Sequence, residues 1–237
     1  MMKDFAGKHV IVMGGSRGIG RSTALAFARR GAAVSICART PGPLAATRQE
    51  IADLGVAAHA ASVDLADAAA IDAYLPDAVK ALGGLDILVN NASGFGHSDD
   101  EAGWGASFDV DLMAVVRGSH AAIPHMAAGG AIVNISSISG LRATSRSAPY
   151  GAIKAAVMHY TASQAKMLAR QGIRVNCVAP GSVEFPGGTW EDRKTSNPDL
   201  YNSTLATIPL HRQTTGLGGH PAQACAAAPP CAAPGPQ

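Results

Sequence analysis

The sequence predicts an α/β fold in which a doubly wound parallel β-sheet is covered by helices on both faces. The first observation is that short, almost wholly apolar runs alternate with longer segments of helical period. Strands buried on both faces have this composition, and strand–helix alternation is typical of parallel sheets. The second is that glycine-rich or polar motifs directly follow several apolar runs, at the strand ends where such sheets bind ligands. A length of 237 residues and an apolar share of 47% suit a single domain with a large core.

The predicted elements alternate regularly along the chain. Apolar runs of strand length predict six strands, at 9–13, 33–37, 57–61, 85–89, 131–135 and 173–178. Helical spacing of apolar residues predicts five helices, at 18–30, 43–54, 67–82, 108–126 and 150–171. The segment 185–210 is expected to form a loop and helices over the ligand-binding end of the sheet.

Composition excludes several classes of function. The formal net charge is only +2 and no basic run occurs, so no nucleic-acid partner is expected. The sequence contains no apolar run long enough for a signal peptide or a membrane span, so we expect a cytoplasmic protein with no membrane contact. The histidines and the four cysteines lack the spacing of metal ligands, so we expect no metal site and interpret the cysteines as reduced thiols.

A glycine-rich turn follows the first predicted strand, at residues 14–20 with the sequence GGSRGIG. Glycine permits a tight turn and lets backbone N–H groups approach a pyrophosphate at a helix N-terminus, as in Rossmann-like dinucleotide-binding folds. The alternative interpretation is a tight strand-to-helix turn that binds no ligand. On the first interpretation, the cofactor-binding residues of this turn are Gly14, Ser16, Arg17, Gly18, Ile19 and Gly20.

Tyr150 and Lys154 lie four residues apart at the start of the helix predicted over 150–171. This spacing places both side chains on one face of a helix. An ammonium group near a phenol favours the phenolate, so we expect the pKa of Tyr150 to fall from about 10 toward working pH, which suits a proton-transfer group. The alternative is an ordinary surface pair.

Five motifs, in this order along the chain, resemble those of the short-chain dehydrogenase/reductase family, including its 3-oxoacyl-acyl-carrier-protein reductases. They are the glycine turn at 14–20, the NNA segment at 90–92, the NISS segment at 134–137, the Tyr150–Lys154 pair and the NCVAPG segment at 176–181. The resemblance covers about residues 5–211. It implies an oxidoreductase that transfers a hydride between a nicotinamide cofactor and a carbonyl or secondary alcohol.

The resemblance also implies a role for each matching residue. Tyr150 would be the catalytic acid and base, Ser137 would hydrogen-bond the substrate oxygen, and Lys154 would bind the nicotinamide ribose and lower the Tyr150 pKa. Besides Tyr150 and Lys154, the cofactor-binding residues that it implies are Asp64, Leu65, Asn90, Asn91, Ala92, Ser93, Pro180, Gly181 and Val183.

The chain departs from the family pattern at the fourth catalytic position, where the family has asparagine and this sequence has Asp111. An aspartate could still hold a bound water through its backbone carbonyl. Its carboxylate could instead offset the effect of Lys154 on Tyr150. We include Asp111 among the predicted catalytic residues and expect an active enzyme.

The end of the second predicted strand favours NADP(H) over NAD(H). Family members that prefer NAD have aspartate, which binds the ribose 2′-hydroxyl, where this chain has Ala38. Arg39 follows, and Arg17 lies in the glycine turn, so two guanidinium groups can meet a 2′-phosphate. The alternative is that both arginines are solvated loop residues.

The substrate is less visible in the sequence. We expect a moderately apolar small-molecule ketone or secondary alcohol, with an acyl-carrier-protein thioester as the alternative. Candidate apolar walls are Phe95, Leu141, Met158, Phe185, Trp190, Tyr201 and Leu205. Two other functions stay open: a redox-silent NADP-binding protein and an inactive truncated paralogue.

Residues 212–237 form an atypical tail after the domain expected at 1–211. The tail has five prolines and no acidic or aromatic residue, so we expect disorder and no usual last strand. It is either an authentic tail or the product of a shifted reading frame. The strand at 173–178 would then be a sheet edge, and we expect a homo-oligomer (a dimer through the helices at 108–126 and 150–171, or a tetramer) or poor solubility.

Overall fold

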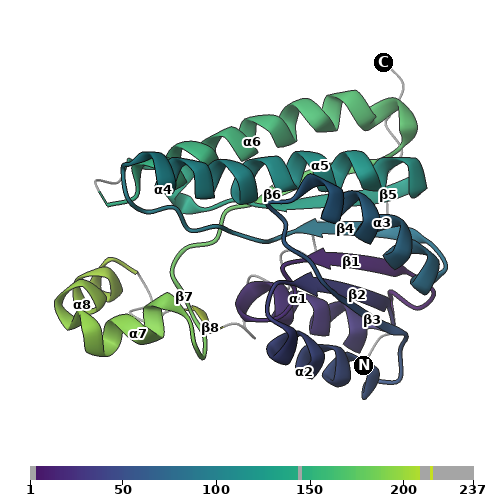
Figure 1. Cartoon of the computed structure of the whole chain (residues 1–237), viewed down its shortest axis with the longest axis horizontal. Coiled ribbons are helices and arrows are strands. Elements are labelled where there is room, and N and C mark those ends of the chain that lie inside the picture. The colour runs from purple at the N-terminus through teal and green to yellow at the C-terminus, as the bar shows by residue number, and fades with distance from the viewer. Residues whose placement is uncertain (1–3, 144–145, 209–213, 216–237) are drawn as a thin grey trace.

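A parallel β-sheet of six strands forms the centre of the computed structural model, which describes residues 4–143, 146–208 and 214–215 (Figure 1). The strand order is β3-β2-β1-β4-β5-β6, and all neighbouring pairs in this sheet are parallel. The order reverses beside β1, and a ligand-binding crevice is expected beyond the strand ends at this point. The strands are β1 (His9–Met13), β2 (Ala33–Ala38), β3 (Ala58–Ser62), β4 (Leu85–Asn90), β5 (Met126–Ile135) and β6 (Arg174–Val178).

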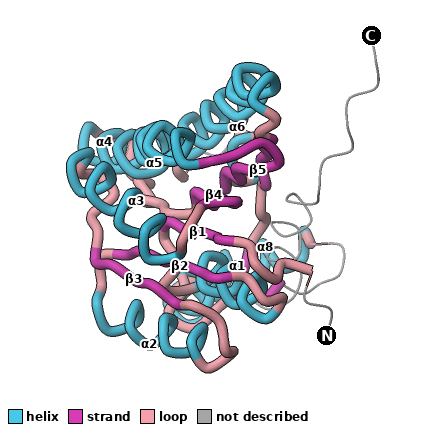
Figure 2. The backbone as a smooth tube through the Cα atoms, turned by 90° about the vertical axis from the view of Figure 1, so that its right-hand side faces the viewer, coloured by secondary structure: helices cyan, strands magenta, loops and turns pink. Residues whose placement is uncertain are grey.

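Helices cover both faces of the sheet (Figures 1 and 2). One face carries α1 (Gly18–Arg29) and α2 (Pro41–Ala52), and the other carries α3 (Ala68–Leu82), α5 (Ala114–Ala122) and α6 (Ala148–Leu168). The remaining helical segments are α4 (Glu101–Ala106), the π-helix η1 (Ser107–Met113), the 3₁₀ turns η2 (Ile123–His125), η3 (Ile138–Gly140) and η4 (Ala169–Gln171), and α7 (Thr189–Ser196) and α8 (Pro198–Thr207). In the part of the chain that the structure describes, no helix is both long and apolar enough to cross a membrane.

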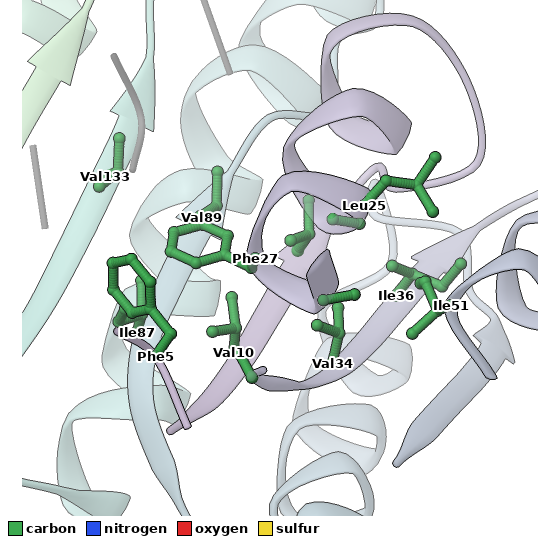
Figure 3. Packing of buried hydrophobic residues seen from close by; sticks show 14 of the residues in the cluster. Phe5, Val10, Leu25, Phe27, Val34, Ile36, Ile51, Ile87, Val89 and Val133 are labelled. Atoms are coloured by element: carbon green, nitrogen blue, oxygen red, sulfur yellow. The ribbon is translucent and has the colours of Figure 1, made fainter. Parts of the chain in front are cut away.

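Each face of the sheet buries its own apolar cluster. On the α1 face, the buried ring of Phe27 meets the ring of Phe5 edge to face, with centroids 5.1 Å apart. Figure 3 shows both rings among valines and isoleucines of β1, β2 and β4. Truncating a buried aromatic ring to alanine typically costs about 3–5 kcal/mol. This packing therefore fixes α1, whose N-terminus begins at the glycine turn.

The predicted fold class is confirmed, since six parallel strands are flanked by helices. The largest correction concerns the helix predicted over 108–126. Helical structure already begins with α4, whose N-terminus is capped by the Asp100 carboxylate, which accepts a 2.8 Å hydrogen bond from the Gly103 N–H. This run of helical segments ends at His125, because Met126 already belongs to β5.

After β6 the chain leaves the main sheet and forms a small unit of its own (Figure 1). In this unit, β7 (Val183–Glu184) pairs in parallel with β8 (Thr214–Thr215). Within the described residues β6 is therefore an edge strand, as expected, and Thr214 and Thr215 pair with β7 rather than with β6. All other residues of the predicted tail lie outside the described part of the chain.

Candidate active site

The glycine turn after β1 is held against its neighbours by backbone contacts. The N–H groups of Gly14 and Gly15 both donate to the Cys37 carbonyl at 2.9 and 3.0 Å, and the Asn91 side-chain amide donates to the Gly14 carbonyl at 2.8 Å. A Cβ at Gly20 would lie 2.0 Å from the Gly14 oxygen, so only glycine fits there. The turn therefore presents the N-terminus of α1 to the crevice.

The other predicted residues of this turn also surround the start of α1. Gly18 has a φ of +53°, a conformation that favours glycine. Arg17 is exposed, and Ser16 and Ile19 are half-buried. The Thr47 hydroxyl of α2 donates to the Ser16 carbonyl at 3.1 Å, which ties the turn to a second helix.

The residues predicted for the adenosine end lie beyond the ends of β2 and β3. Arg39 and Asp64 are exposed there, whereas Leu65 is buried. The Asp64 carboxylate accepts a 3.1 Å hydrogen bond from the Ala66 N–H. Because β1, β2 and β3 are parallel neighbours, Arg17, Arg39 and Asp64 share one edge of the sheet.

Two buried asparagines link the sheet to the helices beneath the site. Asn90 and Asn134 occupy paired positions at the ends of β4 and β5. The Asn90 amide nitrogen donates to the Asn134 side-chain oxygen at 2.8 Å and to the Ser119 hydroxyl at 3.2 Å, and the Asn134 amide donates to the Thr161 hydroxyl at 3.0 Å. The amide of Asn90, which the resemblance assigned to the cofactor wall, is thus directed into the framework that holds α5 and α6.

Ser137, Tyr150 and Lys154 come together at the end of β5. Ser137 follows the strand, and its hydroxyl accepts a 3.1 Å hydrogen bond from the Ser139 N–H. Tyr150 and Lys154 lie near the start of α6, and the Lys154 Nζ is 5.5 Å from the centre of the Tyr150 ring. The Ser136 hydroxyl donates to the Lys154 carbonyl at 2.7 Å, which ties this part of α6 to β5.

Burial raises the pKa of Tyr150 above its ordinary value of 10.0 and is the largest effect on that group. The charge of Lys154 and a hydrogen bond with Ser137 lower this pKa, while the charge of Asp111 raises it. Lys154 therefore acts in the expected direction, but the net direction is upward, so the fall of the Tyr150 pKa toward working pH that we expected is wrong. Helical spacing reveals a neighbouring charge but says nothing about the loss of water around the phenol.

Lys154 and Asp111 form a buried ion pair, with 3.0 Å between Nζ and Oδ1 and side-chain exposures of 2% and 0%. Lys154 also donates to the Ile135 carbonyl at 2.9 Å. The second oxygen of Asp111 accepts a 3.0 Å hydrogen bond from the Gly94 N–H. Of the two roles that the sequence left open for Asp111, the geometry corresponds to the contact between its carboxylate and Lys154.

The loop after β4 places two further rings against Tyr150. The ring of Phe95 stacks on that of Tyr150, and the ring of His97 is tilted to it, each with centroids 5.9 Å apart. Burial and the charge of Arg193 lower the pKa of His97, and the charge of Asp111 raises it. The net direction is downward, which favours a neutral imidazole. We did not single out His97 from the sequence. Its place in the loop that follows the end of β4 was the available signal.

Residues 180–183 lead from β6 to the segment over the crevice. Pro180 is buried, and its carbonyl accepts a 3.0 Å hydrogen bond from the Ile138 N–H beside Ser137. Gly181 is exposed and Val183 is buried. This backbone contact holds the predicted nicotinamide end of the site next to the residue that follows Ser137.

Phe185 lies directly over the glycine turn, since a Cβ at Gly18 would be only 2.7 Å from its ring. The adjacent Glu184 accepts a 2.8 Å hydrogen bond from the Tyr201 hydroxyl and pairs with Lys194. Tyr201 therefore helps to hold α8 on β7, and Lys194 helps to hold α7 there. Of the other predicted wall residues, Leu141 is exposed and Met158, Trp190 and Leu205 are half-buried.

The cysteines and possible metal ligands lie apart from one another. Cys37 and Cys177 are both free thiols, and burial raises the pKa of Cys37 to about 12. Cys225 and Cys231 lie outside the described residues. Nowhere in 4–143, 146–208 or 214–215 do three histidine, cysteine or acidic side chains gather closely enough to hold a metal ion.

A glycine turn at the switch point of a parallel sheet, with serine, tyrosine and lysine at a nearby strand end, is typical of Rossmann-like oxidoreductases. Residues 8–196 match the short chain dehydrogenase family, and the chain belongs to it. It is 38% identical to the cis-4-hydroxycyclohexanecarboxylate dehydrogenase of Sinomonas cyclohexanicum, over 78% of this chain and 77% of that protein. It is also 38% identical to the 3-oxoacyl-acyl-carrier-protein reductase of Staphylococcus aureus, over 86% and 84% of the two chains. A short chain dehydrogenase from Burkholderia cenocepacia, solved in complex with NADP, is 31% identical and has a TM-score of 0.85, with 95% of this chain and 92% of that chain covered.

Proposed function

We propose that this protein transfers a hydride between NADP(H) and a carbonyl or secondary alcohol, with Tyr150 as the acid and base. The observation that carries the proposal is the meeting of Ser137, Tyr150 and Lys154 at the end of β5. A hydroxyl that can hold a substrate oxygen, a phenol that can give a proton and a buried ammonium together suit carbonyl reduction.

The close backbone contacts of the glycine turn support the binding of a dinucleotide. A Cβ at Gly14 would lie 2.8 Å from the Ala92 backbone, so the turn and the β4 loop meet with no room for a side chain at Gly14. Backbone N–H groups at the start of α1 can therefore approach a pyrophosphate closely. Around this cradle, the residues expected to hold the rest of the cofactor are Asp64, Leu65, Asn91, Ala92, Ser93, Tyr150, Lys154, Pro180, Gly181 and Val183.

The choice of NADP(H) rests on charge at the ends of β1 and β2. Ala38 supplies no carboxylate to bind a ribose 2′-hydroxyl, and the exposed Arg17 and Arg39 share this sheet edge. Guanidinium groups bind phosphate oxygens through charge-assisted hydrogen bonds. The NADP complex of the Burkholderia relative supports the same choice.

When bound, the nicotinamide supplies or accepts the hydride. In reduction, the Ser137 hydroxyl holds the substrate oxygen and the Tyr150 hydroxyl gives its proton to that oxygen as negative charge develops there. Lys154 then stabilises the phenolate, which regains a proton from solvent. In oxidation, the Tyr150 phenolate removes the hydroxyl proton. The raised Tyr150 pKa keeps the phenol protonated at neutral pH, which supports reduction as the faster direction there.

The apolar side chain beside Tyr150 supports a moderately apolar ketone or secondary alcohol as the substrate. Phe95 supplies an apolar ring directly beside Tyr150. The substrates named for two relatives, a hydroxycyclohexanecarboxylate and a 3-oxoacyl-acyl-carrier-protein, support an oxygen-bearing carbon in a largely hydrocarbon skeleton.

A panel of ketones and secondary alcohols, assayed with NADPH or NADP⁺ and with NADH or NAD⁺, tests the proposal. We expect turnover that is faster with the phosphorylated cofactor. Cofactor fluorescence on mixing with NADPH is measured in parallel. Binding without turnover would indicate a redox-silent NADP-binding protein, and neither binding nor turnover would indicate an inactive paralogue.

A further inference from the structure

Asp111 owes its inward position to a π-helical turn. In η1 the Ala114 N–H donates to the Asp109 carbonyl, five residues back. A π-turn contains more residues than an α-turn and changes which side chains face inward, and such turns occur often at functional sites. Asp111 is completely buried here, whereas Asp109 on the same turn is only half-buried.

The first contact of Asp111 is with the catalytic lysine. One carboxylate oxygen lies 3.0 Å from the Lys154 Nζ, which also donates to the Ile135 carbonyl. An ammonium without a partner would act on Tyr150 with its full charge. A carboxylate at this distance offsets much of that effect, because Tyr150 then faces an ion pair rather than a cation.

The second contact of Asp111 is with the loop that faces the substrate. Its other oxygen accepts the hydrogen bond of the Gly94 N–H at 3.0 Å. A Cβ at Gly94 would lie 2.2 Å from the Ala106 carbonyl oxygen, so only glycine lets the loop come this close to the helix. The next residue, Phe95, has a φ of +50°, which is rare outside glycine and needs support from its surroundings.

We propose that Asp111 is a positioning residue that acts on Tyr150 from two sides. Its carboxylate offsets the charge of Lys154, and it fastens the loop that presents Phe95 and His97 to the substrate. The inference rests on the function proposed above, since it concerns the same tyrosine. The effect on the charge of Lys154 and the effect on the loop can be separated by substitution. Asparagine at position 111 keeps a hydrogen-bond acceptor for Gly94 but has no charge, whereas alanine has neither.

Other titratable groups also act on Tyr150 or on its neighbours, and their charges contribute to the measured pH dependence. His97 approaches Tyr150 from the β4 loop, and Arg193 of α7 acts on His97. The charge of Lys154 also acts on Cys177 of β6. These groups are unchanged in the variants below, so a difference between variants reports on Asp111.

The charge effect is tested with Asp111→Asn, and Asp109→Asn is the matched control for loss of a negative charge on the same turn. The readouts are the pH dependence of kcat/KM for alcohol oxidation and the phenolate absorbance of Tyr150, taken as the difference from Tyr150→Phe. We expect Asp111→Asn to move both midpoints downward by roughly one pH unit, the order expected when a nearby charge is removed. KM should change little, and the control should match wild type. An unchanged or upward midpoint would overturn the charge effect.

The loop effect is tested with Asp111→Ala by hydrogen exchange of the segment 93–97. We expect faster exchange than in wild type and in Asp111→Asn, together with a several-fold rise in KM. Wild-type exchange in the alanine variant would overturn the loop effect. If that variant does not fold, the comparison of Asp111→Asn with wild type decides instead, since the loop effect requires their exchange at 93–97 to be equal. A wild-type enzyme without turnover would count against the proposed function, whereas the phenolate titration and the exchange would still decide the role of Asp111.

Discussion

At the scale of single residues, Tyr150 shows how burial and charge compete at one atom. Its phenol is largely removed from water, and this raises its pKa more than Lys154 lowers it. The hydroxyl of Ser137 adds to the lowering, and Asp111 opposes it. The result is a phenol that holds its proton at neutral pH, as a general acid for carbonyl reduction must.

The pH dependence of the two reaction directions should follow from this raised pKa. The protonated phenol is the form present below the pKa, so reduction should stay level through neutral pH and fall only in the alkaline range. Oxidation needs the phenolate and should rise with pH over the same interval. Initial rates in both directions across this range check the prediction. A reduction rate that already falls near neutral pH would contradict it.

Tyr150→Phe should lower kcat by about 10²–10⁴-fold, the usual contribution of a positioned proton donor. NADPH binding should be largely unaffected, because the ring is retained. Tyr160→Phe is the control, since Tyr160 lies on the same helix and its hydroxyl accepts a hydrogen bond from Gln164. Retention of more than a tenth of wild-type kcat would show that Tyr150 is not the acid and base.

Cofactor preference should depend on the two positions after the apolar run of β2. Replacing Ala38 with Asp and Arg39 with Gln removes a cation and places a carboxylate near the 2′-phosphate. A charge-assisted hydrogen bond contributes about 1.5–3 kcal/mol, so kcat/KM with NADPH should fall roughly ten- to a hundredfold. Arg29→Gln, an exposed arginine at the end of α1, is the control. A wild-type protein that already prefers NADH would refute the assignment.

At the scale of elements, the connections after strands carry the site, and their shapes depend on close backbone contacts. The glycine turn needs Gly20 because the Gly14 carbonyl lies where a side chain would be. The β4 loop needs Gly94 because it meets the carbonyl of Ala106. In both places the absence of a side chain lets two backbone segments come close together. The close approach at Gly20 shapes the start of α1, and the close approach at Gly94 brings the β4 loop to the helix that carries Asp111.

Phe185 is the point at which the segment over the crevice touches the glycine turn. Its ring lies against Gly18, where the cofactor pyrophosphate is expected, so cofactor binding should displace the ring. Phe185→Ala should therefore lower the Kd for NADPH about fivefold, because a closed form that competes with the cofactor is removed. Fluorescence titration measures this, with the exposed Thr189→Ala as control. A weaker affinity in Phe185→Ala would indicate that the ring instead contacts the bound cofactor.

At the scale of the whole molecule, the surface suggests where copies of the chain would associate. Within the described residues, large apolar side chains are exposed on α4, η1 and α6: Trp104, Phe108 and Met167. β6 is also an edge strand in this part of the chain. Exposed apolar groups and unpaired strand edges both favour association.

We therefore predict a dimer formed through the helices around α5 and α6. Met167→Glu should shift the protein toward monomer, because it places a charge in the predicted apolar interface. Light scattering gives the mass, and Leu54→Glu, an exposed apolar residue that follows α2, is the control. A stable tetramer with exchange-protected amides between residues 222 and 233 would contradict both this prediction and the expected disorder of the tail.

The sequence by itself determined the fold class, the six strands and the group of residues at the strand ends. Strands buried on both faces must be apolar throughout, so runs of apolar residues indicate where they lie. The strand β1, for example, was predicted at its observed bounds. The four-residue spacing of Tyr150 and Lys154 placed both side chains on one face of a helix. Ser137 was joined to this pair by the resemblance to the family.

Only the tertiary structure decided what these residues do to one another. The direction of the Tyr150 pKa depends on burial, which is a property of the packed molecule and not of a four-residue spacing. The pairing of Asp111 with Lys154, and the place of His97 beside Tyr150, depend on a π-turn and on a left-handed Phe95. Neither conformation has a local sequence signal, because each is stabilised by contacts between segments that are distant along the chain.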